Sequence, residues 1–146
     1  MSDFRTLSDR VLASPQLTLA DIETAQSLGI TLIVNNRPEG EAQDQTPGPA
    51  IEAAARDAGM DYVEIPISPG NFGEAQVRAM AEALQRTHGK ALAYCRTGTR
   101  STLLWALSEA AKGVPLETIA SAASSAGYDI SPVLPAMTEL ARHPRG

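Results

Sequence analysis

The chain has 146 residues, of which 43 % are hydrophobic, so it can bury a sizeable core and is not composed like a disordered protein. Its net charge is −5 and its basic residues are scattered, which argues against nucleic acid as the main partner. No apolar run approaches the roughly 18 residues of a membrane span, so no membrane association is predicted. We expect one domain over residues 1–146, with a disordered polar tail from about residue 143.

The cysteine and histidine content limits the redox and metal chemistry. Cys95 is the single cysteine, which excludes an internal disulfide. A lone cysteine in a chain with a polar N-terminus favours a reducing, cytoplasmic compartment. His88 and His143 lie far apart, so one cysteine and two histidines form no zinc motif of the usual spacing. The sequence predicts no metal and no cofactor.

Short apolar runs alternate with stretches of helical periodicity along the chain. Strands are predicted at 11–13, 30–34, 62–65 and 90–94. Helices are predicted at 18–28, 49–58 and 74–87, from Ser101 onward, and from near Pro115 and Pro132. Thr18 and Asp21 have capping-box spacing at the start of the first helix. This alternation predicts an α/β fold with three layers, in which a parallel sheet carries helices on both faces.

Three loops are expected to meet, because ligands of parallel sheets bind outside the carboxyl ends of the strands. These loops cover 35–41, 68–72 and 95–100. The first two supply the candidate cleft residues Asn35, Asn36, Arg37, Glu39 and Phe72, for which turn formation or packing is the alternative role. The carboxylates of Glu39, Glu41 and Asp44 could also face the cleft, although solvated loop charges are the commoner outcome.

The third loop carries the chemistry, because the predicted strand ALAY leads into CRTGTR and then into a helix. Successive backbone N–H groups and a helix N-terminus would form an anion-binding nest there, and their positive potential would favour a Cys95 thiolate. Arg100 could hold two oxygens of an anion. We therefore predict that Cys95 and Arg100 are catalytic. The remaining residues of the anion-binding loop are Arg96, Thr97, Gly98, Thr99 and Ser101.

This loop resembles those of two enzyme families. Tyrosine and dual-specificity phosphatases use a Cys-x5-Arg loop, and rhodanese-type sulfurtransferases mostly use Cys-x4-Arg, which is the spacing of Cys95 and Arg100. The order GITLIVNNRPEGE, GMDYVEIPIS, helix, GKALAYCRTGTRSTLLWAL resembles a dual-specificity phosphatase. The combination is similar to the DUF442 or beta-lactamase hydrolase-like family, a phosphatase-fold group associated with both phosphatase and sulfur-transfer activity. This resemblance implies a phosphatase-like fold with the Cys–Arg loop between the last strand and a helix.

Two departures from the phosphatase pattern favour sulfur chemistry. Tyr94 stands where those enzymes place a histidine, and the loop Ser68-Pro69-Gly70-Asn71-Phe72 lacks the aspartate that acts as their general acid. Phosphate-ester cleavage needs a proton on its leaving oxygen, whereas a thiolate or sulfite leaves as a stable anion. The first hypothesis is therefore transfer of sulfane sulfur through a Cys95 persulfide.

The alternatives are a phosphatase that forms a phosphocysteine and an oxyanion-binding module without turnover. The predicted partners are a small anionic sulfur or phosphate substrate and an external thiol acceptor, since no second cysteine can resolve a persulfide on Cys95. The family resemblance implies a persulfide-oxidising metallo-β-lactamase-type enzyme as one candidate acceptor.

Overall fold

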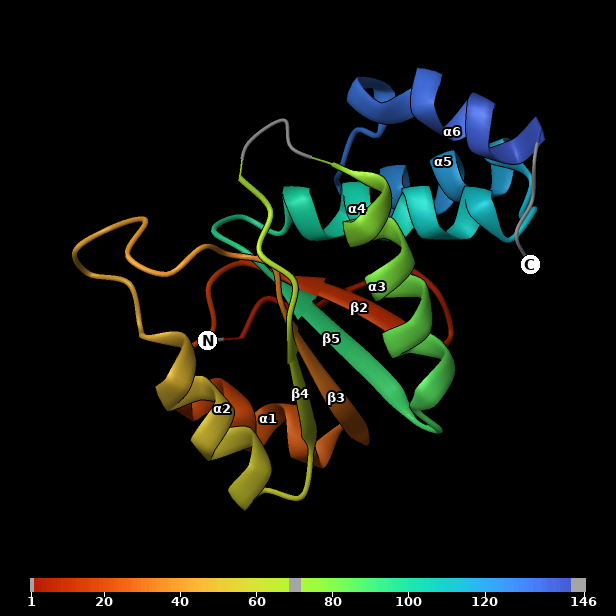
Figure 1. Cartoon of the computed structure of the whole chain (residues 1–146). Helices are drawn as coiled ribbons and strands as arrows, with labels where there is room; N and C mark the ends of the chain where they lie inside the picture. The colour runs from red at the N-terminus through yellow and green to blue at the C-terminus, as the bar shows by residue number, and fades with distance from the viewer. Residues whose placement is uncertain (1, 69–71, 143–146) are drawn as a thin grey trace.

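The computed structural model describes residues 2–68 and 72–142, and within them one sheet lies between two layers of helices (Figure 1). The strand order is β1-β2-β5-β3-β4, and only the pairing of β1 with β2 is antiparallel. The strands are β1 Arg5–Thr6, β2 Val11–Ser14, β3 Ile30–Asn35, β4 Asp61–Glu64 and β5 Lys90–Tyr94.

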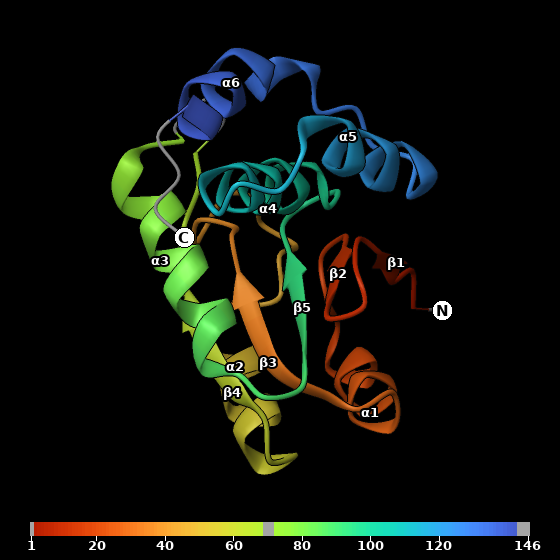
Figure 2. The same ribbon diagram turned by 90° about the vertical axis from the view of Figure 1, so that its right-hand side faces the viewer.

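Helices cover both faces of the sheet. On one face lie α1 (Leu19–Ser27) and α2 (Gly48–Asp57). On the other lie α3 (Glu74–Arg86) and α4 (Thr99–Ala111), and α4 contacts α5 (Leu116–Ser125) and α6 (Leu134–Arg142), as Figure 2 shows. A single 3₁₀ turn, Ser131–Val133, precedes α6. The predicted three-layer α/β fold is confirmed.

Helix α4 lies in the centre of the larger core. It is buried over nearly its whole length, and the indole of Trp105 is 2 % exposed. A helix that is apolar on all sides needs neighbours on all sides, which the sheet, α3, α5 and α6 provide. Its N-terminus is thereby fixed directly above the carboxyl end of β5.

Several details differ from the sequence predictions. The sheet is not wholly parallel, because the unpredicted β1 forms an antiparallel hairpin with β2. Helix α4 begins at Thr99 rather than Ser101, so the last residues of the anion-binding loop already lie in its first turn. The prediction of a disordered tail from 143 falls outside the described residues. In the part of the chain that the structure describes, no helix is long and apolar enough to span a membrane.

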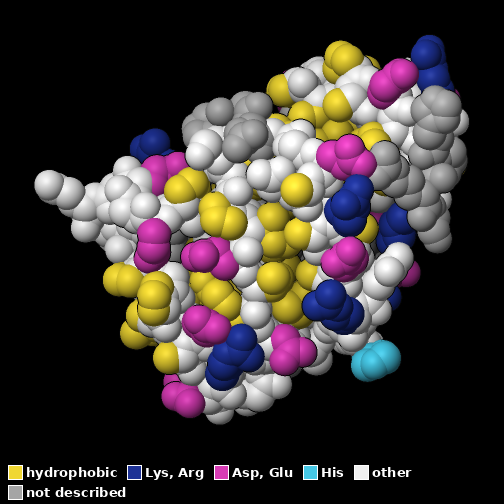
Figure 3. Space-filling view, in the orientation of Figure 1, with side chains coloured by type: hydrophobic (Ala, Val, Ile, Leu, Met, Phe, Trp, Pro, Cys, Tyr) yellow, Lys and Arg dark blue, Asp and Glu magenta, His cyan; other side chains and the backbone are white. Residues whose placement is uncertain are grey.

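The face seen in Figure 1 carries interspersed charges. Figure 3 shows acidic and basic side chains alternating over α3. They form ion pairs one helical turn apart, Arg78 with Glu74 at 3.0 Å and Arg86 with Glu82 at 3.6 Å. These exposed pairs neutralise each other locally and leave no concentrated charge over α3.

Candidate active site

Cys95 follows β5 directly and has no exposed surface. Its Sγ accepts a hydrogen bond from the backbone N–H of Gly98 at 3.1 Å, and Gly98 is the N-cap residue of α4. The chain turns back sharply enough for this contact because Gly98 has φ +91°. The sulfur therefore lies at the positive end of a helix dipole and faces a backbone donor, the environment expected of a nucleophilic thiolate.

Tyr128 holds the outer side of this turn. Its hydroxyl donates to the carbonyl of Thr97 at 3.1 Å, and a Cβ on Gly98 would overlap the same hydroxyl oxygen. The guanidinium of Arg5 lies 5.2 Å from the centre of the Tyr128 ring. Burial raises the pKa of Tyr128, so the hydroxyl remains a donor. Sequence reasoning missed this residue, because it comes from the distant connection between α5 and α6.

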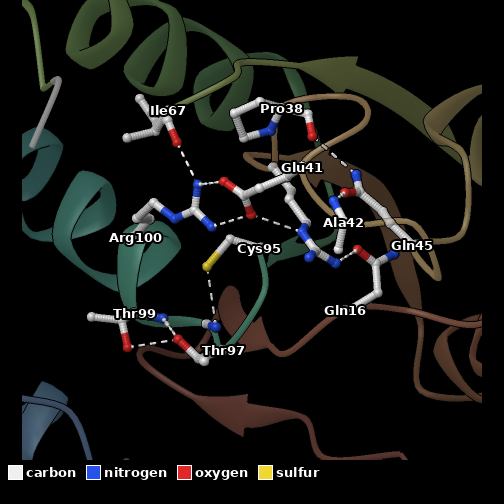
Figure 4. Close-up of polar contacts among 12 residues, drawn as sticks. Gln16, Pro38, Glu41, Ala42, Gln45, Ile67, Cys95, Thr97, Thr99 and Arg100 are labelled. Carbon is white, nitrogen blue, oxygen red and sulfur yellow. Dashed lines mark hydrogen bonds and ion pairs between the residues drawn. The ribbon is translucent and has the colours of Figure 1, made fainter. Parts of the chain in front are cut away.

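The other loop residues divide into exposed and buried ones. Thr97 and Thr99 are exposed, and the Thr97 hydroxyl donates to that of Thr99 at 2.9 Å (Figure 4). Arg96 is exposed, and its carbonyl accepts from the backbone N–H of Gln16. Ser101 is fully buried, and its hydroxyl has no hydrogen-bond partner among the described residues.

Arg100 is bound by a carboxylate from the loop after β3. Its Nη1 donates to Oε2 of Glu41 at 2.8 Å and its Nη2 donates to Oε1 at 2.7 Å (Figure 4). Nη1 also donates to the carbonyl of Ile67 at 2.7 Å. The first and third of the loops expected to meet therefore do so through Glu41 and Arg100. Ile67 lies just before the predicted second loop, 68–72, of which residues 69–71 fall outside the described residues.

A second arginine shares the same carboxylate. Nε of Arg37 donates to Oε1 of Glu41 at 2.9 Å, and Nη1 of Arg37 donates to Gln16 at 2.9 Å. The Arg37 side chain is 5 % exposed, so its charge needs this partner. The hydrogen bonds from Arg100 and Arg37 lower the pKa of Glu41 from 4.5 to about 2, and Arg100 has the larger effect. The same ion pair raises the pKa of Arg100.

Of the acidic loop residues, Glu41 and not Glu39 faces the nucleophile loop. The carboxylate of Glu39 accepts from the backbone N–H of Gly48 at 2.7 and 3.1 Å, at the N-terminus of α2. It therefore caps that helix instead of entering the cleft. Asp44 is exposed. The choice of Glu39 as a cleft residue is corrected to Glu41.

The two asparagines fix the ends of the strands. The Asn35 side chain accepts from the N–H of Arg37 at 2.9 Å and donates to Tyr62 at 2.9 Å. Asn36 donates its backbone N–H to the carbonyl of Tyr94 at 2.8 Å and its side chain to Ile65 at 2.9 Å. Asn36 therefore bonds the residue before the nucleophile, while Asn35 orients the backbone that leads to Arg37.

Two aromatic residues pack in other parts of the molecule. Tyr94, just before Cys95, packs in the core on the α1 and α2 face. Phe72, predicted as a cleft residue, is found in another depression of the surface. It lines a groove of ≈ 560 Å³ between α3, α4 and α6, together with Val77, Leu107 and Leu140. In the described part of the chain, no group of three or more His, Cys, Asp or Glu side chains could hold a metal ion.

Comparison with known proteins places the chain in a family. Residues 3–112 match the phosphatase-like domain of the beta-lactamase hydrolase-like proteins. The beta-lactamase hydrolase-like protein of Agrobacterium fabrum is 35 % identical over 107 residues, which are 73 % of this chain and 25 % of that protein. The chain thus spans about a quarter of the length of the curated relatives that it matches.

Solved structures support the same assignment. A "putative phosphatase" of Neisseria meningitidis Z2491 (nma1982) is 31 % identical with a TM-score of 0.84, over 94 % of this chain and 98 % of that one. A "putative phosphatase (DUF442)" of Shewanella putrefaciens CN-32 is 21 % identical with a TM-score of 0.75, over 96 % and 91 % of the two chains, and shows the shared fold. The predicted phosphatase-like fold and family are therefore confirmed, and the chain belongs to the phosphatase-like domain family of the beta-lactamase hydrolase-like proteins.

Proposed function

We propose that this protein is a cysteine-dependent enzyme that transfers sulfane sulfur from a persulfide or thiosulfate to a thiol acceptor. The observation that carries the proposal is the state of Glu41, the carboxylate that faces Arg100. Both of its oxygens accept hydrogen bonds from Arg100, and Arg37 donates to one of them. These contacts lower its pKa to about 2 and keep it ionised near neutral pH, so it has no proton to give to a leaving alkoxide. Sulfur transfer needs no such proton.

The transfer needs only the Cys95 thiolate, the donor and an external thiol, and its bonds and electrons balance. The Cys95 thiolate attacks the outer sulfur of the donor, a new S–S bond forms, and the donor's own bond to that sulfur breaks. The leaving thiolate or sulfite keeps the electron pair of the broken bond. The Gly98 N–H, which bonds Sγ at 3.1 Å, would stabilise negative charge on the resulting persulfide. An external thiolate then attacks the outer sulfur and releases the Cys95 thiolate, with no net oxidation.

Phosphatase activity is the second candidate, and the comparisons favour it over sulfur transfer. The family is described as phosphatase-like, and the name of the 31 % identical Neisseria protein includes the word phosphatase. In this reading Cys95 would attack phosphorus and form a phosphocysteine. Shared fold alone does not determine the group transferred, because one fold carries many chemistries.

The acceptor follows from the single cysteine. A persulfide on Cys95 has no second thiol in the chain to resolve it, so the acceptor is an outside thiol. We propose that a metallo-β-lactamase-type enzyme that oxidises persulfides receives the product.

The test is the intact mass of the protein after treatment with glutathione persulfide or thiosulfate, with Cys95→Ser as control. A gain of one sulfur atom in the wild type alone is the expected result. A parallel assay measures hydrolysis of an aryl phosphate and its inhibition by vanadate. Vanadate-sensitive hydrolysis without sulfur uptake would replace the proposal with the phosphatase alternative. Anion binding by Cys95→Ser but not by Arg100→Ala, with neither reaction, would indicate a binding module.

A further inference from the structure

The buried side chain of Arg37 makes polar contacts that lead to both ends of the nucleophile loop, residues 95–100. We propose that Arg37 is a positioning residue for Arg100. It acts through Glu41 at one end of the loop and through Gln16 at the other, and its own guanidinium does not contact the substrate. The inference goes beyond the proposed function, because it applies whichever group Cys95 transfers.

The first contact leads to the end of the loop. Nε of Arg37 donates to Oε1 of Glu41 at 2.9 Å, and the two oxygens of this carboxylate accept from Arg100 at 2.7 and 2.8 Å (Figure 4). Glu41 is an exposed residue between β3 and α2, outside any helix or strand. Its position therefore depends on its two arginine partners, of which Arg37 is the more deeply buried, 5 % against 13 % exposed.

The second contact leads to the start of the loop. Nη1 of Arg37 donates to Oε1 of Gln16 at 2.9 Å. The backbone N–H of Gln16 in turn donates to the carbonyl of Arg96 at 3.2 Å, one residue after the nucleophile. The backbone N–H of Arg37 donates to the side chain of Asn35 at 2.9 Å, which fixes the chain where the arginine begins. Loss of Arg37 would therefore remove the link that joins the two ends of the loop.

One edge of Arg100 remains available for an anion. Nη1 uses both of its hydrogens, on Glu41 and on the carbonyl of Ile67, and Nη2 uses one, on Glu41. In the part of the chain that the structure describes, no oxygen accepts from Nε or from the second hydrogen of Nη2. These two N–H groups are parallel, as two-point binding of a carboxylate, sulfate or phosphate requires. The ion pair with Glu41 and, more weakly, interaction with Cys95 raise the pKa of Arg100, so its guanidinium lies near the nucleophile.

The experiment compares two alkylating reagents of Cys95 that differ in charge. Iodoacetate carries a carboxylate, and iodoacetamide carries a neutral amide of nearly the same size. The ratio of their rate constants reports how well the site holds an anion beside the thiolate, because changes in thiol ionisation or access affect both rates. Arg100→Ala should lower this ratio about tenfold or more, since it removes charge-assisted hydrogen bonds to the carboxylate. No turnover is needed, so the result does not depend on the proposed function.

Two variants test the positioning. Arg37→Met should lower the ratio of iodoacetate to iodoacetamide rates several-fold, because Glu41 and with it Arg100 lose their fixed position. Gln16→Ala changes no charge and should lower the ratio in the same direction, by a smaller factor. Thermal melting confirms that each protein is folded, and Gln16→Ala decides the test if Arg37→Met does not fold.

The matched control is Arg10→Met. Arg10 also donates to groups from a distant part of the chain, the backbone carbonyls of Thr87 and Gly89, but these lie before β5 rather than after it. Its replacement should lower the melting temperature and leave the ratio at the wild-type value. A purely structural effect of losing an arginine would lower stability in the same way without changing the ratio.

An unchanged ratio in a folded Arg37→Met variant would overturn the proposal, and an unchanged ratio in Gln16→Ala would overturn the part that runs through Gln16. The double variant Arg37→Met/Arg100→Ala separates positioning from direct attraction. If Arg37 acts only through Arg100, the double variant should match Arg100→Ala alone. A further fall in the ratio would mean that the charge of Arg37 attracts the anion directly, which would also overturn the positioning role.

Discussion

The backbone N–H of Gly98 donates to Sγ of Cys95 at 3.1 Å, and the Tyr128 hydroxyl packs against the Cα of the same glycine. Gly98 thus meets two requirements at once: its φ is +91°, and it has no Cβ, which would overlap the Tyr128 hydroxyl. A side chain there would have to displace either the tyrosine or the loop that faces the sulfur.

Replacement of this glycine tests both demands. Gly98→Ala should lower the free energy of unfolding by more than the roughly 1–2 kcal/mol of a left-handed alanine, and should abolish sulfur uptake by Cys95. Gly29→Ala is the matched control, since Gly29 has φ +82° and no atom within 4 Å of an added Cβ. Urea unfolding measures both variants. Equal losses of stability would show that the contact with Tyr128 is unimportant.

The Tyr128 hydroxyl provides a milder test of the same loop. Tyr128→Phe removes the hydrogen bond to the Thr97 carbonyl and leaves the ring beneath Arg5 in place. We expect a loss of about 0.5–1.5 kcal/mol in stability and a several-fold slower reaction of Cys95, because the turn is less firmly held. The rate of alkylation by iodoacetamide measures the second effect, and an unchanged rate would contradict this role.

Replacement of Ser101 should slow the reaction without lowering the free energy of unfolding. Its buried hydroxyl lacks a partner among the described residues, so Ser101→Ala should leave the free energy of unfolding unchanged or raise it by up to about 1 kcal/mol. Sulfur transfer should nevertheless slow several-fold if the hydroxyl serves the reacting anion. Thr102→Val is the contrast, because Thr102 donates to the Gly98 carbonyl at 2.8 Å and should lose about 1 kcal/mol. A Ser101→Ala variant with full activity would remove Ser101 from the site.

Acid stability should report the ion pair of Glu41. The folded protein lowers the pKa of this carboxyl from 4.5 to about 2, so its stabilisation is complete above about pH 4.5 and is lost as the pH falls toward 2. Glu41→Gln lacks that contribution at every pH. The difference in unfolding free energy between the wild type and the variant should therefore shrink across this range. Urea titrations at several pH values measure it, and a constant difference would be inconsistent with the ion pair.

The central strands and the start of the first helix were predictable from the sequence. The runs at 30–34 and 90–94 are apolar because both faces of a central strand are covered, and they became β3 and β5. The capping box of Thr18 and Asp21 is present at the start of α1. By contrast, β1 has two polar residues, too few to show any periodicity. This short strand forms only by antiparallel pairing with the edge of β2.

The nucleophile loop was predictable as far as its local pattern extends. Gly98 takes the positive φ expected at a tight turn, and Arg100 follows in the first turn of the helix. The choice among the loop carboxylates was not predictable, because residues 36–47 have no periodicity that would show which side chains turn inward. Glu41 was one of three candidate carboxylates, and only its hydrogen bonds to Arg100 distinguish it from Glu39 and Asp44. Phe72 lines the groove between α3, α4 and α6. The prediction of one domain stays a prediction.

The absence of exposed surface on Cys95 also affects how fast the protein loses activity through oxidation of this thiol. A thiolate open to solvent is oxidised by peroxide, first to a reversible sulfenic acid and then to acids that cells rarely repair. Here the only thiol of the chain lies beneath its neighbours, so reagents that do not move those side chains aside have little access to it. Peroxide should therefore inactivate the resting protein slowly. Oxidation of Cys95 should be fastest while the site is open to admit substrate.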